Sequence, residues 1–315
     1  MKHTKRIRIV LNAITAAAVI IVGVCAGSVF VHPISVFKIF GNALFGTGLD
    51  GVPDSSVSII MTIRFPRVLL GFLTGAALSV CGTAVQSVLR NPLASPFTLG
   101  VSSGASLGAG IVIACELTFL GRFTLHAAGL VFGVAAMFLM VAFASKIDRT
   151  LQGSTIVLTG MVLSLFVNGI VSVMANAKDE KYKQIMKWQT GSFSGKWEYV
   201  IILAAVLAVC LVYFLIKSRE LDLLTFGDEQ AQSAGVSTRR EKALILLVTA
   251  VLSGTAVAFA GVIGFIDLVS PHVARRFFGA EHKLLVPMAA LIGGTFMVLC
   301  YLAARTGIPP NELPG

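Results

Sequence analysis

Long, nearly uninterrupted runs of apolar residues dominate the chain. Seven runs hold about 18 residues or more, the length of helix that crosses a hydrocarbon core about 30 Å thick. They lie at 9–31, 68–88, 93–115, 123–145, 156–177, 199–216 and 243–266, and an eighth follows at 284–304. A helix satisfies its own backbone hydrogen bonds where water is absent. The pattern therefore predicts an all-α, polytopic membrane protein in which residues 1–315 form a single transmembrane domain.

Three segments between these runs also have a helical pattern. Residues 33–45 predict a helix on the outer interface of the membrane, and the loop at 178–198 predicts a short amphipathic helix followed by a turn. In the loop at 217–242, Asp228 is suited to cap a short helix that Gly235 ends. This pattern favours a helix that docks on a soluble partner, and it also fits an ordinary solvated helix.

Composition agrees with lipid as the main solvent of the chain. Hydrophobic residues make up 56% and charged residues 13%, with a mean hydropathy of +0.88, whereas about a quarter of the residues in a soluble domain are charged. The cysteines have the wide spacing of buried apolar residues, not that of a zinc site or a disulfide framework. They are Cys25, Cys81, Cys115, Cys210 and Cys300. We therefore expect no metal site, and no basic cluster with interleaved aromatic residues indicates nucleic acid as a partner.

The distribution of basic residues decides whether the interrupted apolar stretch at 261–283 crosses the membrane. If it crosses, 15 of the 25 Lys and Arg residues lie on the side of the N-terminus, and if it does not, 13 do. Basic residues favour the cytoplasmic side. We therefore predict a short, broken span at 264–278, a cytoplasmic N-terminus, a cytoplasmic loop at 217–242 and an extracytoplasmic loop at 178–198.

Small residues recur at four-residue spacing within the apolar runs. They are Gly71 and Gly75, then Gly100, Gly104 and Gly108, then Gly129 and Gly133. In lipid no hydrophobic force draws helices together, so close backbone approach along such faces drives their association. The spacing predicts a compact helix bundle, but channels, transporters and intramembrane enzymes all use it.

Few ionisable groups lie deep in the predicted spans. Asp267 and His272 lie in the broken span, and His126 lies near the outer end of the fourth run. An ion-coupled carrier needs such groups to bind its driving ion, and Asp267 keeps a secondary transporter open as an alternative. The chain also lacks the GxxxxGK[ST] spacing that cradles nucleotide phosphates. We expect the driving energy to come from a separate protein.

Four motifs together resemble one family of membrane proteins. The first is RFPRVLLGFLTGAALSVCGTAVQSVLRNPLASPFTLGVSSGASLGAG at 64–110, followed by GDEQAQSAGV at 227–236. GVIGFIDLVSPHVAR at 261–275 and ARTGIPPNELP at 304–314 come next. In this order and spacing, over nearly the whole chain, they resemble FecCD-type permeases of ATP-binding-cassette (ABC) importers for iron-siderophores, haem and cobalamin.

The resemblance implies a transport subunit of the bacterial cell membrane, not an enzyme, with ten transmembrane helices in the family fold. It also implies a second permease subunit, a cytoplasmic ABC ATPase that uses the ATP, and an extracytoplasmic substrate-binding protein. The chain itself would bind no cofactor. Iron-siderophore is the first expectation for the cargo, with haem and cobalamin next.

Residue roles follow from the same resemblance. Docking of the binding protein would use Arg64, Arg67 and Arg305, whose guanidinium groups suit carboxylate partners. The alternative for Arg64 and Arg67 is anchoring of a helix end at the interface. The ATPase-coupling helix would comprise Gly227, Asp228, Glu229, Gln230, Ala231, Gln232, Ser233, Ala234 and Gly235. The pathway and its inner gate would use Asn91, Pro92, Gln152, Gly153, Ser154, Thr155, Pro271 and His272.

The chain departs from the family pattern at two places. Asp267 stands where the family has glycine, which predicts different packing at the broken span. The sequence ends at Gly315, where relatives continue into a tenth span. We therefore predict about nine spans in this chain. The last helix of the family fold would either follow residue 315 in a longer sequence or be naturally absent from a short subunit.

Overall fold

The structure, a computed structural model, consists of helices joined by short connections. It describes residues 2–27, 30–46, 48–49, 51–175, 179–193 and 196–307. The longer helices are α1 Lys2–Cys25, α4 Phe65–Leu89, α5 Val101–Cys115, α6 Thr124–Ile147, α7 Gly153–Ala175, α9 Trp197–Ile216, α12 Thr238–Ala260 and α14 His282–Gly307. The shorter ones are α2 Pro33–Phe45, α3 Asp54–Ser58, the π-helical η1 Ile59–Arg64, the 3-10 helix η2 Gly121–Phe123, α8 Asp179–Thr190, α10 Ser218–Phe226, α11 Asp228–Ser233 and α13 Ile266–Phe278. Over these residues no strand occurs, as the all-α prediction requires.

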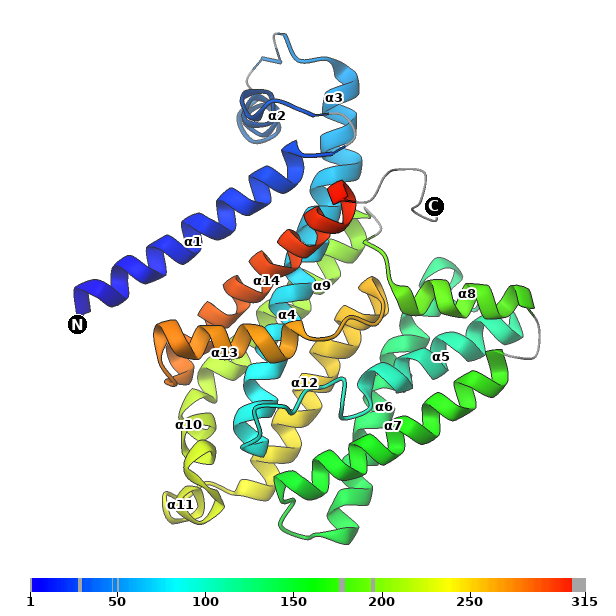
Figure 1. Cartoon of the computed structure of the whole chain (residues 1–315), viewed down its shortest axis with the longest axis vertical. Helices are drawn as coiled ribbons and strands as arrows, with labels where there is room; N and C mark the ends of the chain where they lie inside the picture. The colour runs from blue at the N-terminus through cyan, green and yellow to red at the C-terminus, as the bar shows by residue number, and fades with distance from the viewer. Residues whose placement is uncertain are drawn as a thin grey trace.

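Helix α4 forms the centre of the bundle. It packs against α14, α12, α13 and α9, while α5, α6, α7 and α8 form a group on one flank and α1 lies against α14 on the other (Figure 1). Nearly all side chains of α4 from Val68 onward are buried, whereas much of α1 is exposed. Because lipid can cover apolar side chains as well as protein can, an exposed apolar α1 is compatible with a place at the edge of the bundle.

Seven helices in the described part of the chain are long and apolar enough to cross a membrane. Their ranges are 5–25, 54–89, 121–147, 153–174, 197–216, 238–260 and 282–306. The two other predicted crossings, α5 and α13, have 15 and 13 residues. The total of nine spans counts both and stays a prediction, and the expected tenth helix lies outside the described residues.

The third apolar run is helical over only part of its length. Residues 93–100 form turns, and α5 begins at Val101 after Gly100, which has a φ of 97°. The prediction of a span over 93–115 is therefore wrong for its first eight residues. Pro96 explains part of the difference, because proline disfavours a helical conformation in the residue before it, and the side chains of Ser95 and Thr98 bond backbone amides locally.

Helix α4 continues an outer helix that the apolar pattern did not reveal. α3, η1 and α4 form one uninterrupted helical rod over 36 residues, Asp54–Leu89. Pro66 is tolerated near the start of α4 because the neighbouring π-helical turn already shifts the backbone hydrogen bonds. Only residues 68–88 of this rod were predicted from the sequence, because the polar residues at 54–58 interrupt the apolar pattern at its beginning.

Glycines bring the helix axes together at the predicted faces. A Cβ on Gly75 would overlap the carbonyl oxygen of Gly293, so α4 and α14 touch through their backbones. A Cβ on Gly104 would lie 2.5 Å from the carbonyl oxygen of Phe132, and one on Gly108 at 2.5 Å from that of Ala128. The expectation of close small-residue packing is confirmed for α4 with α14 and for α5 with α6.

The broken segment leads from α8 across the bundle to the neighbourhood of α10. The backbone amide of Val262 donates to the carbonyl of Gln189 in α8 at 3.2 Å, and residues 261–264 are not helical. α13 then runs across the other helices (Figure 1) and ends near α10, because His282 bonds Asp222. The interruption predicted near Gly264 is therefore present, with its helical part at Ile266–Phe278.

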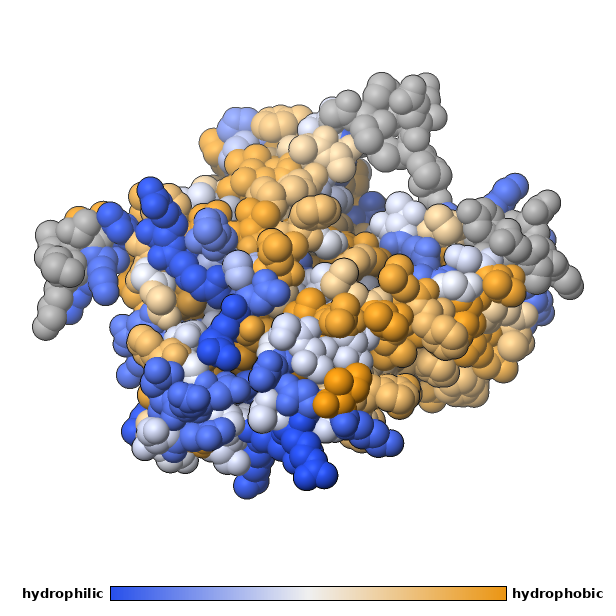
Figure 2. Space-filling view, turned by 60° about the horizontal axis from the view of Figure 1, so that its bottom comes forward, coloured by the Kyte–Doolittle hydropathy of each residue, from blue (hydrophilic) through white to orange (hydrophobic). Residues whose placement is uncertain are grey.

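Hydrophilic residues gather at the end of the bundle that carries α10 and α11. Figure 2 brings this end forward and shows a hydrophilic surface bordered by a broad hydrophobic one. Exposed apolar side chains on the flank include Leu158, Leu165 and Phe166 of α7 and Val209 of α9. The surface thus has the division expected of a helix bundle whose sides face lipid and whose end faces water.

Candidate translocation pathway and coupling site

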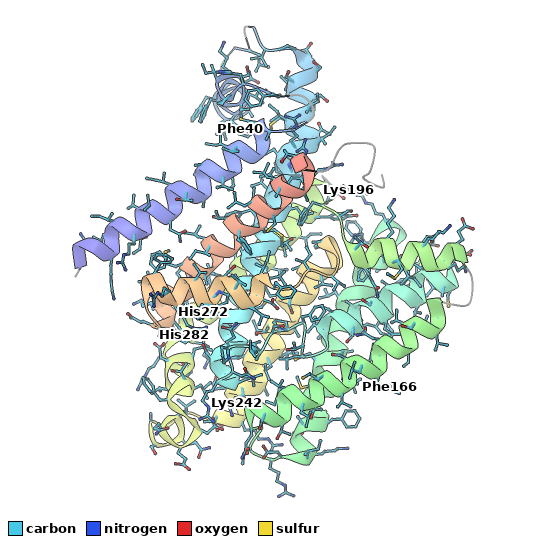
Figure 3. The ribbon with its side chains drawn as sticks, in the orientation of Figure 1. Phe40, Phe166, Lys196, Lys242, His272 and His282 are labelled. Carbon is cyan, nitrogen blue, oxygen red and sulfur yellow. The ribbon has the colours of Figure 1, made fainter. Side chains whose placement is uncertain are left out.

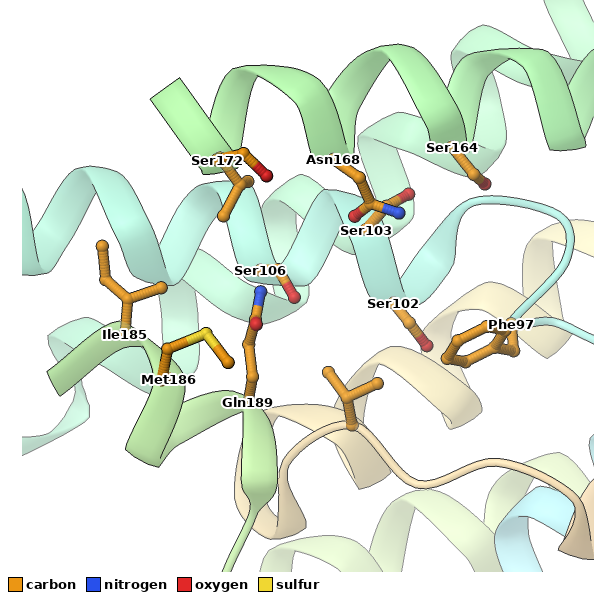
Figure 4. Close-up of a pocket in the computed structure, with 12 residues that line it drawn as sticks. Phe97, Ser102, Ser103, Ser106, Ser164, Asn168, Ser172, Ile185, Met186 and Gln189 are labelled. Atoms are coloured by element: carbon orange, nitrogen blue, oxygen red, sulfur yellow. The ribbon is translucent and has the colours of Figure 1, made fainter. Parts of the chain in front are cut away.

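A cavity lined by neutral polar side chains lies between α5, α7 and α8. Its volume is about 560 Å³, and Figure 4 shows hydroxyl and amide groups converging on it from three helices. Its lining consists of Phe97, Ser102, Ser103, Ser106, Ser164, Asn168, Val171, Ser172, Ile185, Met186, Gln189 and Val262. The lining contains no charged side chain. It can exchange hydrogen bonds with a polar molecule without offering a strong electrostatic trap.

Helical periodicity places these side chains on facing surfaces. Ser164, Asn168 and Ser172 recur every four residues and therefore share one face of α7, as Ser102 and Ser106 do on α5. None of these residues is among the pathway residues that were predicted from the sequence. The four-residue recurrence of Ser and Asn inside an apolar run was the signal that could have found them.

The other side of α7 is apolar and exposed. Leu165 is 73% exposed, Phe166 67% and Val173 75%, and Figure 3 shows Phe166 pointing away from the bundle. α7 therefore has a polar face on the cavity and an apolar face available to lipid or to another membrane protein.

A second cavity, of about 780 Å³, lies at the end that carries α11. Its lining brings the predicted gate residues Gln152, Gly153 and Ser154 opposite the predicted coupling residues. The complete lining is Leu89, Arg90, Thr150, Gln152, Gly153, Ser154, Gly227, Asp228, Glu229, Gln230 and Gln232. Two segments to which the family resemblance assigned different tasks thus line the same cavity.

The gate segment lies against the end of α4. A Cβ on Gly153 would overlap the carbonyl oxygen of Leu89, so α7 begins in direct backbone contact with α4. Asn91 follows at once, and its side-chain oxygen accepts the amide of Leu93 at 2.9 Å. The structure therefore brings residues 152–154 next to Leu89 and Arg90, while the predicted gate residues Asn91, Pro92 and Thr155 line neither cavity.

Asp148 shapes the turn that leads into α7. Its carboxylate accepts the hydroxyl of Thr150 at 2.6 Å and the backbone amides of Thr150 and Gln152, both at 2.8 Å. These bonds stabilise the ionised carboxylate and hold the pKa of Asp148 below its usual value. The bond from the Thr150 hydroxyl has the largest effect, and the two backbone amides come next. The turn is thus fixed by bonds to one ionised side chain.

The predicted coupling helix is short and bounded by two glycines. α11 covers Asp228–Ser233, with Gly227 at a φ of 125° and Gly235 at 85°, both of which favour glycine. Asp228 lies one residue inside the helix and makes no capping bond, so the expectation that it caps α11 is wrong; it pairs with Lys242 at 2.6 Å. Only Ala231 is fully buried. The exposed residues are Glu229, Gln230, Gln232, Ser233, Ala234 and Gly235.

Helix α10 is fixed to the membrane helices by a histidine. Nδ1 of His282 lies 2.5 Å from Oδ1 of Asp222, and its Nε2 lies 2.7 Å from Oγ of Ser87 in α4. Lys217 at the start of α10 bonds Glu241 of α12 at 2.9 Å and Glu220 at 3.1 Å. The bond to Glu241 is the main cause that raises the pKa of Lys217. The loop at 217–242 is therefore a packed unit.

The three predicted docking arginines lie in different environments. Arg64 is 2% exposed and donates to the carbonyls of Val24 and Cys25 at 3.3 and 3.1 Å. Arg67 is exposed, and Arg305 is half-buried against the ring of Tyr301, with its guanidinium carbon 5.9 Å from the ring centroid. Burial of Arg64 fits the alternative of helix anchoring, because its side chain fixes the end of α1.

The predicted pathway residues of α13 do not reach either cavity. Pro271 is buried, and His272 is exposed on the side of the bundle (Figure 3). Asp267 is 1% exposed, and its carbonyl accepts the amide nitrogen of Gln86 at 3.2 Å. Arg275 in turn donates to the side-chain oxygen of Gln86 at 2.5 Å. The backbone carbonyl of Asp267 is thus part of a polar contact between α13 and α4.

Known proteins of similar sequence are permeases. The ABC transporter permease protein YvrB of Bacillus subtilis is 38% identical over 301 residues, which cover 95% of this chain and 85% of YvrB. The hemin transport system permease protein HmuU of Yersinia pestis is 36% identical over 83% of this chain and 79% of its own length. The Fe(3+)-citrate import system permease protein YfmE of Bacillus subtilis is 32% identical over 100% and 93%.

A solved structure has the same fold. It is described as an inward-facing conformation of an ABC transporter of metal-chelate type, with a TM-score of 0.81 and 26% identity. The match covers 94% of this chain and 90% of the other. Fold and sequence together define the class: an ABC transporter permease, a multi-pass membrane subunit that carries out transport.

The family within this class follows from a match over most of the chain. The sequence profile of the FecCD transport family covers residues 14–315, so the chain belongs to this family.

Proposed function

We propose that this permease moves an iron(III) chelate of the siderophore type into the cytoplasm, with haem and cobalamin as the next candidates. The observation that carries the proposal is the neutral, hydroxyl- and amide-lined cavity on α7. A passage that must release its cargo gains from many weak hydrogen bonds and loses from a buried charge, which would hold a charged chelate tightly. Relatives named for haem and ferric citrate transport support this class of cargo.

A separate cytoplasmic ABC ATPase supplies the energy in this proposal. The exposed residues of α11, bounded by Gly227 and Gly235, present a small projecting surface at the hydrophilic end of the bundle. Such an element suits a groove on a soluble partner. ATP is bound by that partner, and this chain binds no cofactor.

The outer end receives a substrate-binding protein. Arg67 is exposed and Arg305 is half-buried at the end opposite α11, where guanidinium groups can pair with carboxylates of a partner. Arg64 supports this surface from below by fixing the end of α1.

A second permease subunit, identical or closely similar, completes the pathway. The exposed apolar residues of α7, among them Leu165 and Phe166, lie on the helix that also lines the polar cavity. A partner that covers them would place two such cavities side by side. In this arrangement α11 and the N-terminus lie in the cytoplasm, in agreement with the excess of basic residues on that side.

Uptake by the reconstituted complex tests the proposal. The permease, its ATPase and its binding protein are placed in liposomes with ATP inside, and uptake of ⁵⁵Fe-labelled ferric hydroxamate, ferric citrate and haem is measured. We expect uptake of at least one chelate that needs ATP, and loss of that uptake in the double variant Asp228→Pro, Gly235→Pro. Uptake that persists in this variant, or that needs no ATP, would contradict the proposal.

The alternative is an ion-coupled secondary transporter, for which Asp267 would bind the driving ion. Its buried position is compatible with that role, but Asp267 lies outside the lining of both cavities. Collapse of the proton and sodium gradients at constant internal ATP separates the two mechanisms. Loss of uptake under this treatment would favour the alternative.

A further inference from the structure

Lys242 is a buried cation with partners in two other segments. Its ammonium group lies 2.6 Å from Oδ2 of Asp228 in α11 and 3.1 Å from the carbonyl oxygen of Leu151, just before α7. The residue is 1% exposed, and Figure 3 shows it at the start of α12 between these segments. A buried ammonium group is strongly unfavourable unless all its bonds are made, so the position of Lys242 depends on both partners.

A cavity lies between α11 and the start of α7. The cavity of about 780 Å³ has Gln152 and Ser154 on one side and Gln230 and Gln232 on the other. Packed side chains transmit a displacement from one segment to the next, whereas a cavity between the segments does not. The bonds of Lys242 therefore form a physical connection between two segments that the cavity otherwise separates.

The Leu151 end of this connection is part of a stiff turn. Leu151 is 1% exposed and has a φ of 55°, unusual for a residue with a side chain. Asp148 bonds the amide of Gln152, and Gly153 lies against Leu89. A pull on the carbonyl of Leu151 therefore moves the beginning of α7 with it.

We propose that Lys242 is a positioning residue that couples the movement of α11 to the beginning of α7, and thereby to the inner end of the polar cavity. The proposal rests on the proposed docking of an ATPase on α11. It assigns Asp228 the task of holding Lys242 toward α11, in addition to any contact that α11 makes with the ATPase. Conformational coupling of this kind requires an element whose position depends on both sites. Lys242 meets this condition, because its ammonium group bonds Asp228 in α11 and the carbonyl of Leu151 before α7.

The experiment measures whether α11 and α7 move together. Spin labels are attached to cysteines at Gln230 and Ser154, both exposed, in the assembled complex with and without ATP under non-hydrolysing conditions. In the wild-type background we expect a narrow distribution of the distance between the two labels, and we expect ATP to leave this distribution unchanged. In Lys242→Met we expect ATP to shift or broaden it, and chelate uptake to fall at least tenfold while the ATPase still co-purifies.

Three variants separate coupling from a merely structural role. Lys242→Arg keeps a cation with several donors and should restore at least half of the uptake. Lys217→Met is the matched control, because Lys217 also bonds two carboxylates of this region but makes no bond to Leu151; it should keep the narrow distribution. The exchange Asp228→Lys with Lys242→Asp keeps the ion pair but removes the donor to Leu151, and uptake should stay low.

The proposal would be overturned by a Lys242→Met distance distribution that matches that of the wild type with ATP, or by full uptake in the exchanged pair. Loss of the ATPase from the Lys242→Met complex would likewise assign Lys242 to docking alone. The distance measurement needs no cargo. If no chelate is transported by the wild-type complex, the proposed cargo fails, whereas the label distances still decide the role of Lys242.

Discussion

At the scale of single residues, close backbone contacts dominate the packing around α4. Gly82 is the tightest of them, because a Cβ there would overlap the carbonyl oxygen of Asp267 at the start of α13. That carbonyl also accepts the bond from Gln86. The glycine therefore allows α13 to begin against the surface of α4.

Gly82→Ala should destabilise the permease by about 3 kcal/mol, because overpacking against backbone cannot be relieved by a side-chain rotation. The measurement is the apparent Tm of the purified permease in detergent. Gly169→Ala is the control, since Gly169 lies in α7 with nothing within 4 Å of a new Cβ; helix propensity there favours alanine by up to about 1 kcal/mol. Equal Tm values for the two variants would show that α13 does not press on α4 at this point.

At the scale of elements, the loop at 217–242 is a folded unit held by a few polar bonds. His282, at the start of α14, connects Asp222 of α10 with Ser87 of α4. The orientation of α10 in turn fixes where α11 begins, since only Gly227 separates the two helices. Stability of the loop thus depends on a side chain from a helix far away in the sequence.

His282→Ala should cost about 2–4 kcal/mol, because it leaves two partly buried polar groups without their bonds. We expect faster hydrogen exchange of the amides in α10 and α11 than in the wild type. Lys283→Ala, at the exposed neighbouring position, should leave the exchange unchanged. Unaltered protection of α10 in His282→Ala would mean that apolar packing of Leu221 and Leu224 alone holds this helix.

At the scale of the whole molecule, the two cavities and α7 define an axis through the bundle. The polar cavity lies toward α8, and the second cavity lies at the end with α11. Both are lined in part by α7, which has one face on the cavities and an apolar face outside. In the proposed pathway, cargo would have to pass from one cavity to the other.

Bulky substitutions in the polar cavity should block passage without uncoupling the ATPase. In Ser106→Leu with Ser164→Leu we expect chelate uptake to fall at least tenfold, because both side chains point into the cavity (Figure 4), while ATP hydrolysis continues. Ser145→Leu, in α6 outside both cavities, is the control. Normal uptake in the double variant would place the pathway elsewhere.

Much of this architecture could be predicted from the sequence, and the limits have physical causes. Apolar length alone indicated the seven long apolar helices, and Gly227 and Gly235 marked the ends of α11. Local patterns could not reveal that Arg64 turns inward or that Asp228 pairs with Lys242, since both depend on contacts between distant segments. The start of α5 at Val101 could not be predicted, because apolar composition at 93–100 does not distinguish a helix from a buried turn.

The rod formed by α3, η1 and α4 is much longer than a membrane is thick. Its 36 residues correspond to about 54 Å, against a hydrocarbon core of about 30 Å. A tilt of about 5° at its outer tip would displace the opposite tip by about 5 Å if the rod moves as one body. Leu89 at the other end of the rod contacts Gly153 through its backbone. A tilt of the rod as one body would therefore displace the beginning of α7 as well.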